Sequence, residues 1–108
     1  MAGTRIAWAH GDEALLGTLR HEFDCAVEDA EALGVSSTTL ARMREIERST
    51  DRERPECMLA GLRAMFTACL DNIDADWDGE RYRGNAEASM AEDLSRTLAR
   101  FDLHEVRP

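Results

Sequence analysis

Apolar residues recur every three to four positions over most of this 108-residue chain. That spacing places them on one side of an α-helix, and no stretch alternates apolar and polar residues with the period of two typical of a strand. A chain of this length has room for one hydrophobic core, so every helix must bury its apolar side against the others. We therefore expect a single all-α domain over residues 1–108, a compact bundle of about four amphipathic helices, with two packed helix-loop-helix units as an alternative arrangement.

The first two helices are predicted from this periodicity and from the residues that begin or end a helix. The first spans about residues 12–33, and Gly34 follows it as a helix-ending residue. The second begins in the Ser and Thr cluster of residues 36–39, which offers several N-caps, and ends near Ser49. Its apolar stripe is short and narrow, which predicts a position at the edge of the bundle.

The third and fourth helices carry the broader apolar faces. The third is predicted from Pro55 to Asp74 and is expected to be the central helix, because apolar residues cover one broad side of it. The fourth follows Asn85, a candidate N-cap, with its buried positions expected at Met90, Leu94, Leu98 and Phe101. The methionines at helical spacing are expected to fill the core rather than to form an adaptable groove.

The two ends of the chain lack a sustained period. Residues 1–11 contain Ile6 and Trp8 and are predicted to form either a loose arm or a short extended segment on the bundle, and residues 102–108 a frayed tail. Trp8 is suited to cover the flank of a short bundle or a second subunit, so a homodimer stays open.

The charge of the chain restricts its partners. Its 22 acidic residues outnumber its 13 basic ones, giving a net charge of -9. Such a surface repels phosphate backbones and anionic membranes, which argues against direct nucleic-acid or membrane binding and favours a protein partner with a basic surface. No apolar run is long enough to cross a bilayer and the start lacks a signal-peptide pattern, so a cytoplasmic location is expected. The three cysteines are expected to be reduced thiols, with Cys69 in the core.

One acidic stretch suggests a specific chemistry. Asp74, Asp76 and Asp78 occupy alternate positions between the third and fourth predicted helices, and Gly79 follows them. A hard divalent cation binds six to eight oxygens, alternate residues of a tight loop point their side chains inward, and glycine permits the sharp reversal of the chain. This arrangement matches the opening half of an EF-hand calcium loop.

Residues 62–94 accordingly resemble the EF-hand family, in particular divergent proteins of the calerythrin and sarcoplasmic calcium-binding type. The resemblance implies a calcium site formed by Asp74, Asp76, Asp78, Glu80 and Asn85 or Glu87. Two positions depart from the family pattern. Asn85 stands where the family has a bidentate glutamate, and Arg81 stands where it has an aliphatic residue that pairs with a partner loop. Both departures lower the expected calcium affinity.

A second cluster lies on the first predicted helix. His21, Asp24, Cys25 and Glu28 share its polar face at helical spacing, so their side chains are candidates to bind one transition metal, the arrangement that an enzyme would need. An ordinary solvated acidic face explains the same residues, and we favour that interpretation because no second helix supplies metal ligands.

The sequence thus favours a non-catalytic module that binds a basic protein partner, as an inhibitor, adaptor or regulator. Asp24, Glu28 and Glu31 on the first predicted helix are the expected contact residues. One form of this hypothesis is nucleic-acid mimicry, in which carboxylates take the positions where the partner expects phosphates. The alternative is a calcium-binding protein with the divergent EF-hand-like loop at 74–85.

Overall fold

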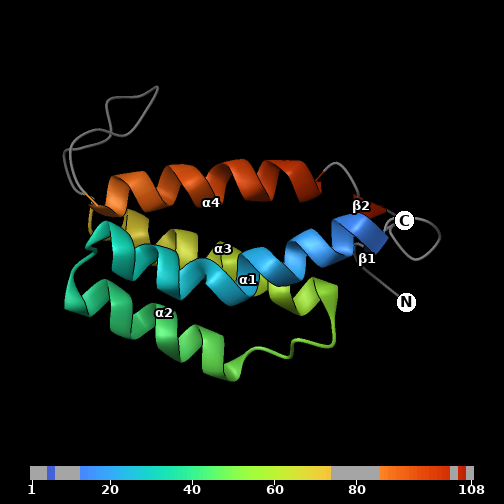
Figure 1. The fold of residues 1–108 in the computed structure, drawn as a ribbon, viewed down its shortest axis with the longest axis horizontal. Coiled ribbons are helices and arrows are strands. Elements are labelled where there is room, and N and C mark those ends of the chain that lie inside the picture. The colour runs from blue at the N-terminus through green and yellow to red at the C-terminus, as the bar shows by residue number, and fades with distance from the viewer. Residues whose placement is uncertain (1–4, 7–12, 74–85, 103–104, 107–108) are drawn as a thin grey trace.

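Four helices form the bundle in the computed structural model, which describes residues 5–6, 13–73, 86–102 and 105–106 (Figure 1). They are α1 (Glu13–Leu33), α2 (Ser37–Ser49), α3 (Pro55–Leu70) and α4 (Ala86–Asp102). Figure 1 shows α3 behind α1, with α4 along one side of this pair and α2 along the other. The predicted all-α bundle of about four helices is confirmed.

The turn from α1 to α2 contains Gly34 and Ser36, which the sequence analysis predicted to end the first helix and to begin the second. Gly34 has a φ of 89°, a left-handed conformation that glycine adopts without strain. Its N–H donates to the carbonyl of Glu31, and the N–H of Val35 donates to that of Ala30, which is the Schellman pattern at the end of a helix. Ser36 then caps α2, since its side chain accepts a hydrogen bond from the N–H of Thr39.

Helix α3 begins at Pro55, as predicted, but ends at Leu70, earlier than the predicted Asp74. The N–H of Asn72 bonds to the carbonyl of Cys69, one residue closer than in an α-helix. The carbonyl of Ala68, its helical partner, instead accepts from the side-chain amide of Asn72 at 3.1 Å. This competition between side chain and backbone ends the helix.

The core lies where the four apolar faces meet. Helix α3 contributes the largest share, with six side chains that are fully buried: Met58, Leu59, Leu62, Met65, Ala68 and Cys69. The predicted core positions of α4, Met90, Leu94, Leu98 and Phe101, are all buried. Met43, Met58, Met65 and Met90 are core residues as expected. Fully burying one such side chain stabilises the fold by about 1.5–3 kcal/mol, so this shared core is the main source of stability.

The two ends of the chain pair with each other. Strand β1 (Arg5–Ile6) runs antiparallel to strand β2 (Glu105–Val106), with Arg5 opposite Val106 and Ile6 opposite Glu105. The arm at 1–11 therefore contains a short extended segment, one of its two predicted forms. The tail that was predicted to fray contains its partner strand.

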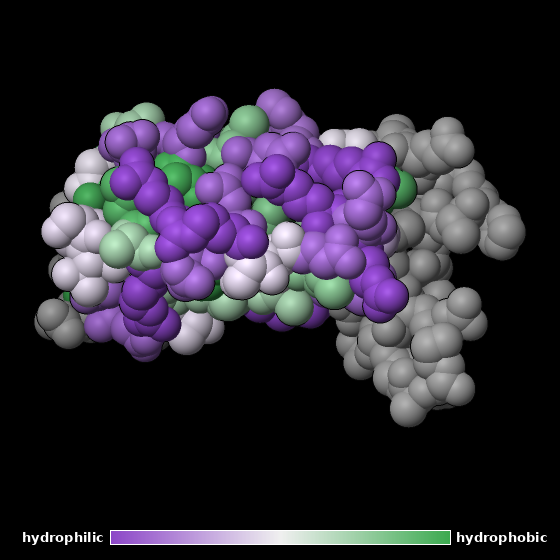
Figure 2. Space-filling model, turned by 90° about the horizontal axis from the view of Figure 1, so that it is seen from below, coloured by the Kyte–Doolittle hydropathy of each residue, from purple (hydrophilic) through white to green (hydrophobic). Residues whose placement is uncertain are grey.

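Viewed from the side of α2, the described surface is mostly hydrophilic, with small apolar areas between the charged groups (Figure 2). Helix α2 is peripheral as predicted, because only Thr39 and Met43 among its residues are fully buried. Among the described helices, none has the length and apolar character needed to span a membrane.

Two helical glycines give a matched test of this packing. A Cβ added at Gly61 in α3 would come within 2.9 Å of both the ring of Phe23 and the hydroxyl of Thr50, whereas one added at Gly17 in α1 meets nothing within 4 Å. We expect Gly61→Ala to destabilise the protein by about 1–3 kcal/mol through overpacking. Gly17→Ala should instead stabilise it by about 0.5–1 kcal/mol, through its helix propensity.

Urea denaturation of both variants beside the wild type measures these changes. The same chemical change is made in two helices, so a difference of sign reports the close contacts of Gly61 with Phe23 and Thr50. Equal stabilisation by both substitutions would show that α3 does not approach α1 this closely.

Candidate functional site

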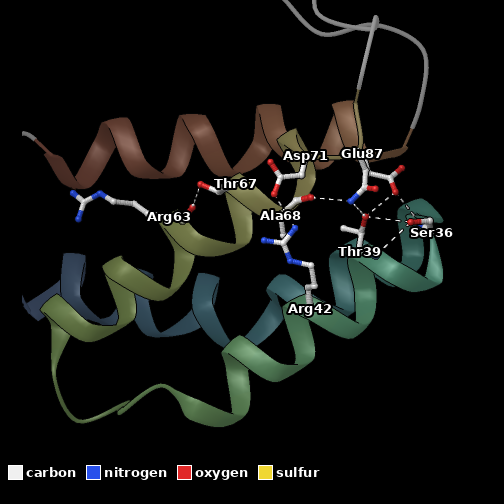
Figure 3. Close-up of polar contacts among 9 residues, drawn as sticks. Ser36, Thr39, Arg42, Arg63, Thr67, Ala68, Asp71 and Glu87 are labelled. Carbon is white, nitrogen blue, oxygen red and sulfur yellow. Dashed lines mark hydrogen bonds and ion pairs between the residues drawn. The ribbon is translucent and has the colours of Figure 1, made fainter.

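A partly buried polar cluster ties the start of α4 to the turn between α1 and α2 (Figure 3). Glu87, in the first turn of α4, is only 7% exposed. Its Oε2 accepts from the N–H of Ser36 at 2.9 Å and from the hydroxyl of Thr39 at 3.0 Å. The same hydroxyl accepts from the side-chain amide of Asn72 at 2.9 Å. Residues from three helical segments thus share one set of hydrogen bonds, which we call the Glu87 network.

The Glu87 network completes the N-terminal cap of α2. In a capping box, a glutamate three residues after the cap residue accepts from the backbone N–H of that cap residue. Here Thr39 occupies the glutamate position, and Glu87 supplies the carboxylate from another helix. Burial raises the pKa of Glu87, but the hydrogen bonds from Ser36 and Thr39 outweigh it and hold the pKa below its usual value. The carboxylate therefore stays ionised.

The predicted calcium site can be compared with the structure at one residue. Asp74, Asp76, Asp78, Glu80 and Asn85 lie outside the described residues. Glu87 is described, and its Oε2 is held in the Glu87 network. Its carboxylate has a structural role here that the sequence analysis did not anticipate.

The predicted contact residues on α1 are partly engaged by arginines. Asp24 lies 3.2 Å from Arg52, and Glu31 lies 3.2 Å from Arg44 of α2. Glu28 is exposed and has no ion-pair partner among the described residues. The two pairs are exposed by about half at each side chain, so each contributes only about 0.2–1 kcal/mol and a competing partner can replace it.

The opposite flank of α1 has carboxylates that the sequence analysis did not select. Glu22 and Asp29 line a groove of about 300 Å³ between α1 and α4, and neither has an ion-pair partner in the described part of the chain. Their spacing of seven residues places them on one side of the helix. That spacing was visible in the sequence, but the position of α4 beside them was not. A second hollow of about 500 Å³ lies between α2 and α3, where Arg42 is held by Asp71 at 2.8 Å.

The sequence analysis weighed a transition-metal cluster on α1 against an ordinary solvated acidic face, which it favoured. Among the described residues, no three His, Cys, Asp or Glu side chains lie close enough to hold a metal ion. His21 and Cys25 make a contact, with the sulfur 3.8 Å from a ring nitrogen. Desolvation first, and then Asp29 and three further carboxylates of α1, raise the pKa of the Cys25 thiol. Cys25 is therefore a poor nucleophile and a poor thiolate ligand.

Searches with known family models, with curated proteins and with solved structures found no match to this chain. Its function must therefore be inferred from its own residues.

The Glu87 network predicts a pH-dependent contribution to stability. We expect Glu87→Gln to destabilise the protein by about 1–2 kcal/mol, because charge-assisted hydrogen bonds become neutral ones. The folded-state pKa of Glu87 lies below the ordinary value of 4.5. The contribution of its charge is therefore fully present above pH 4.5 and is lost as the pH falls through the lower folded-state pKa.

Urea denaturation at a series of pH values measures the difference between the variant and the wild type. The control is Glu28→Gln, which removes an exposed carboxylate from α1 and should change stability by less than about 0.5 kcal/mol. A difference for Glu87→Gln that does not shrink in acid would contradict the assigned role of the charge.

Proposed function

We propose that this protein is a non-catalytic, acidic module that binds a basic surface of a protein partner. The observation that carries the proposal is a set of carboxylates on α1, Glu22, Glu28 and Asp29, that form no ion pair within the described residues. We call them the free α1 carboxylates. They add to a chain whose net charge is -9, so a basic partner is attracted over a distance before contact is made.

The distribution of arginines supports this proposal. Arg44 and Arg52 neutralise one flank of α1, and Arg42 neutralises Asp71 at the end of α3. The free α1 carboxylates form no such ion pair within the described residues, although Arg100 lines the groove beside Glu22 and Asp29. They therefore add to the negative potential of α1. Desolvation makes the largest contribution to the raised pKa of Cys25, and Asp29, Glu28, Asp24 and Glu22 raise it further, which is in keeping with a negative potential along α1. A surface of this kind suits an inhibitor or adaptor, including one that presents carboxylates in place of nucleic-acid phosphates.

The state of two of the three cysteines, Cys25 and Cys69, supports a non-catalytic role. A catalytic thiol needs a lowered pKa and a neighbouring base. Burial raises the pKa of Cys69 to about 11, with a further contribution from Glu87, and that of Cys25 is raised as well. Both thiols are protonated in ordinary cellular conditions, so neither is activated for attack.

Capture of partners at graded salt concentrations tests this function. Three immobilised proteins are compared: the wild type, a variant with Glu22→Gln, Glu28→Gln and Asp29→Asn, and a control with Glu53→Gln, Glu56→Gln and Glu92→Gln. The control removes the same charge from side chains that also lack ion pairs among the described residues. We expect basic proteins to be retained by the wild type and the control, to be retained at least about tenfold less by the α1 variant, and to elute as salt rises.

Retention that is insensitive to salt, or that both variants reduce equally, would reject the proposal. Circular dichroism of all three proteins verifies that each is folded.

Calcium binding by the loop at 74–85 is the alternative function, and it rests on the aspartates at alternate positions before Gly79. We expect a calcium-specific rise in melting temperature that Asp74→Ala with Asp78→Ala abolishes. At ten times the dissociation constant, calcium would stabilise the fold by about 1.4 kcal/mol, which corresponds to a rise of roughly 5 °C.

Thermal melting by circular dichroism after chelation measures this rise, with magnesium as the ion control and Glu53→Ala with Glu56→Ala as the variant control. An unchanged melting temperature in millimolar calcium would remove this alternative and leave the acidic stretch as a turn or a patch of charge.

A further inference from the structure

We propose that the groove between α1 and α4 binds a single arginine side chain of the partner. This inference rests on the proposed function and names the contact through which it acts. The groove has a volume of about 300 Å³, enough to enclose one long side chain but not a folded element. Its lining combines an apolar floor, a buried hydroxyl and carboxylates, which are the groups that an arginine needs.

Three apolar residues lie among the charged residues that line the groove, and we call them its floor. Ala26 lies on α1 between Glu22 and Asp29, and it lines the groove together with Met90 and Leu94 of α4. These three floor residues are 2–3% exposed, so they belong to the core and present only a narrow apolar strip to the groove. An arginine side chain is suited to such a surface, because its methylene stem packs on apolar groups while its charged end reaches polar ones.

A buried hydroxyl provides independent evidence for a ligand. Thr97 lines the groove and is only 6% exposed. Three polar residues are buried in the described part of the chain, and the other two, Thr39 and Glu87, bond to each other. The hydroxyl of Thr97 has no hydrogen bond to any protein group there. A polar group left unpaired at such burial costs free energy, and a donor from a ligand in the groove would remove that cost.

The charges at the rim favour one cation. Glu22 and Asp29 are unpaired on the α1 side, whereas Asp93 on the α4 side is held by Arg96 at 2.7 Å. Arg100 also lines the groove, so the charges at the rim sum to about one negative charge. A rim of this kind suits one cationic side chain better than a segment with several consecutive cationic residues. A guanidinium has five donors in one plane, so it can bond to a carboxylate and to the Thr97 hydroxyl together, whereas the compact ammonium of lysine is less suited to acceptors spread around a groove.

Nuclear magnetic resonance titration tests the assignment with three probes. These are a capped Gly-Arg-Gly tripeptide, its citrulline counterpart, which has the same shape without the charge, and hexa-arginine. We expect the arginine tripeptide to shift the methyl signals of Ala26, Met90 and Leu94 at millimolar concentration, and the citrulline tripeptide to leave them unchanged.

Four variants identify the groups that bind. Glu22→Gln and Asp29→Asn should each weaken binding of the arginine tripeptide severalfold, and Thr97→Val should weaken it roughly two- to tenfold. Arg100→Gln should strengthen it, because a cation no longer meets a like charge, whereas an anionic occupant would be weakened by that change. The control Glu56→Gln should have no effect.

Thr97→Val also has a readout without any ligand. Because it removes an unpaired buried hydroxyl at constant shape, the melting temperature should stay the same or rise, so weaker binding by this variant is not a sign of unfolding. A clear fall in melting temperature would show that the hydroxyl already has a structural partner, and would overturn the assignment.

The two proposals fail in different ways. If hexa-arginine shifts signals on α1 away from the groove and the groove variants bind it normally, the groove assignment is overturned while the acidic binding function stands. If neither arginine probe shifts any signal at low salt, both proposals are overturned.

Discussion

The burial of α3 against the three other helices is the constraint on which the rest of the structure depends. A domain of 108 residues has one core, and α3 supplies six fully buried side chains to it. At Gly61 this packing is tight, since a Cβ added there would come within 2.9 Å of the ring of Phe23 and of the hydroxyl of Thr50. The Glu87 network and the groove between α1 and α4 both lie around this apolar centre.

The Glu87 network adds what apolar packing alone does not provide. Apolar faces tolerate sliding of one helix along another, whereas buried hydrogen bonds have one correct register. Glu87 lies in the first turn of α4 and accepts from the cap residue of α2, so one carboxylate lies near the positive ends of two helix dipoles. Together with the hydrogen bonds, this environment offsets the cost of burying the charge. We infer that the network fixes where α4 begins relative to the turn between α1 and α2.

The sequence predicted the helices better than it predicted the sites, for a physical reason. Periodicity, Gly34, Ser36 and Pro55 are local signals, and they located the ends of α1, α2 and the start of α3 correctly. The end of α3 was wrong because the side chain of Asn72 takes the carbonyl that would continue the helix. The role of Glu87 was missed because its partner Ser36 lies 51 residues earlier in the chain. Contacts between residues so far apart in the sequence depend on how the helices pack, so no local sequence pattern predicts them.

The same packing decides which carboxylates are free to act. Asp24 and Glu31 are on the flank of α1 that faces the arginines of α2 and the following loop, so their charge is largely used within the molecule. Glu22 and Asp29 are on the flank beside α4, where Asp93 already engages Arg96. Ala26 between them is too small to fill the space, which leaves a groove with an apolar floor where a larger residue would have closed it. Helix α1 thereby has one flank whose carboxylates pair with arginines of this chain and another flank, beside α4, where we propose that an arginine of the partner binds.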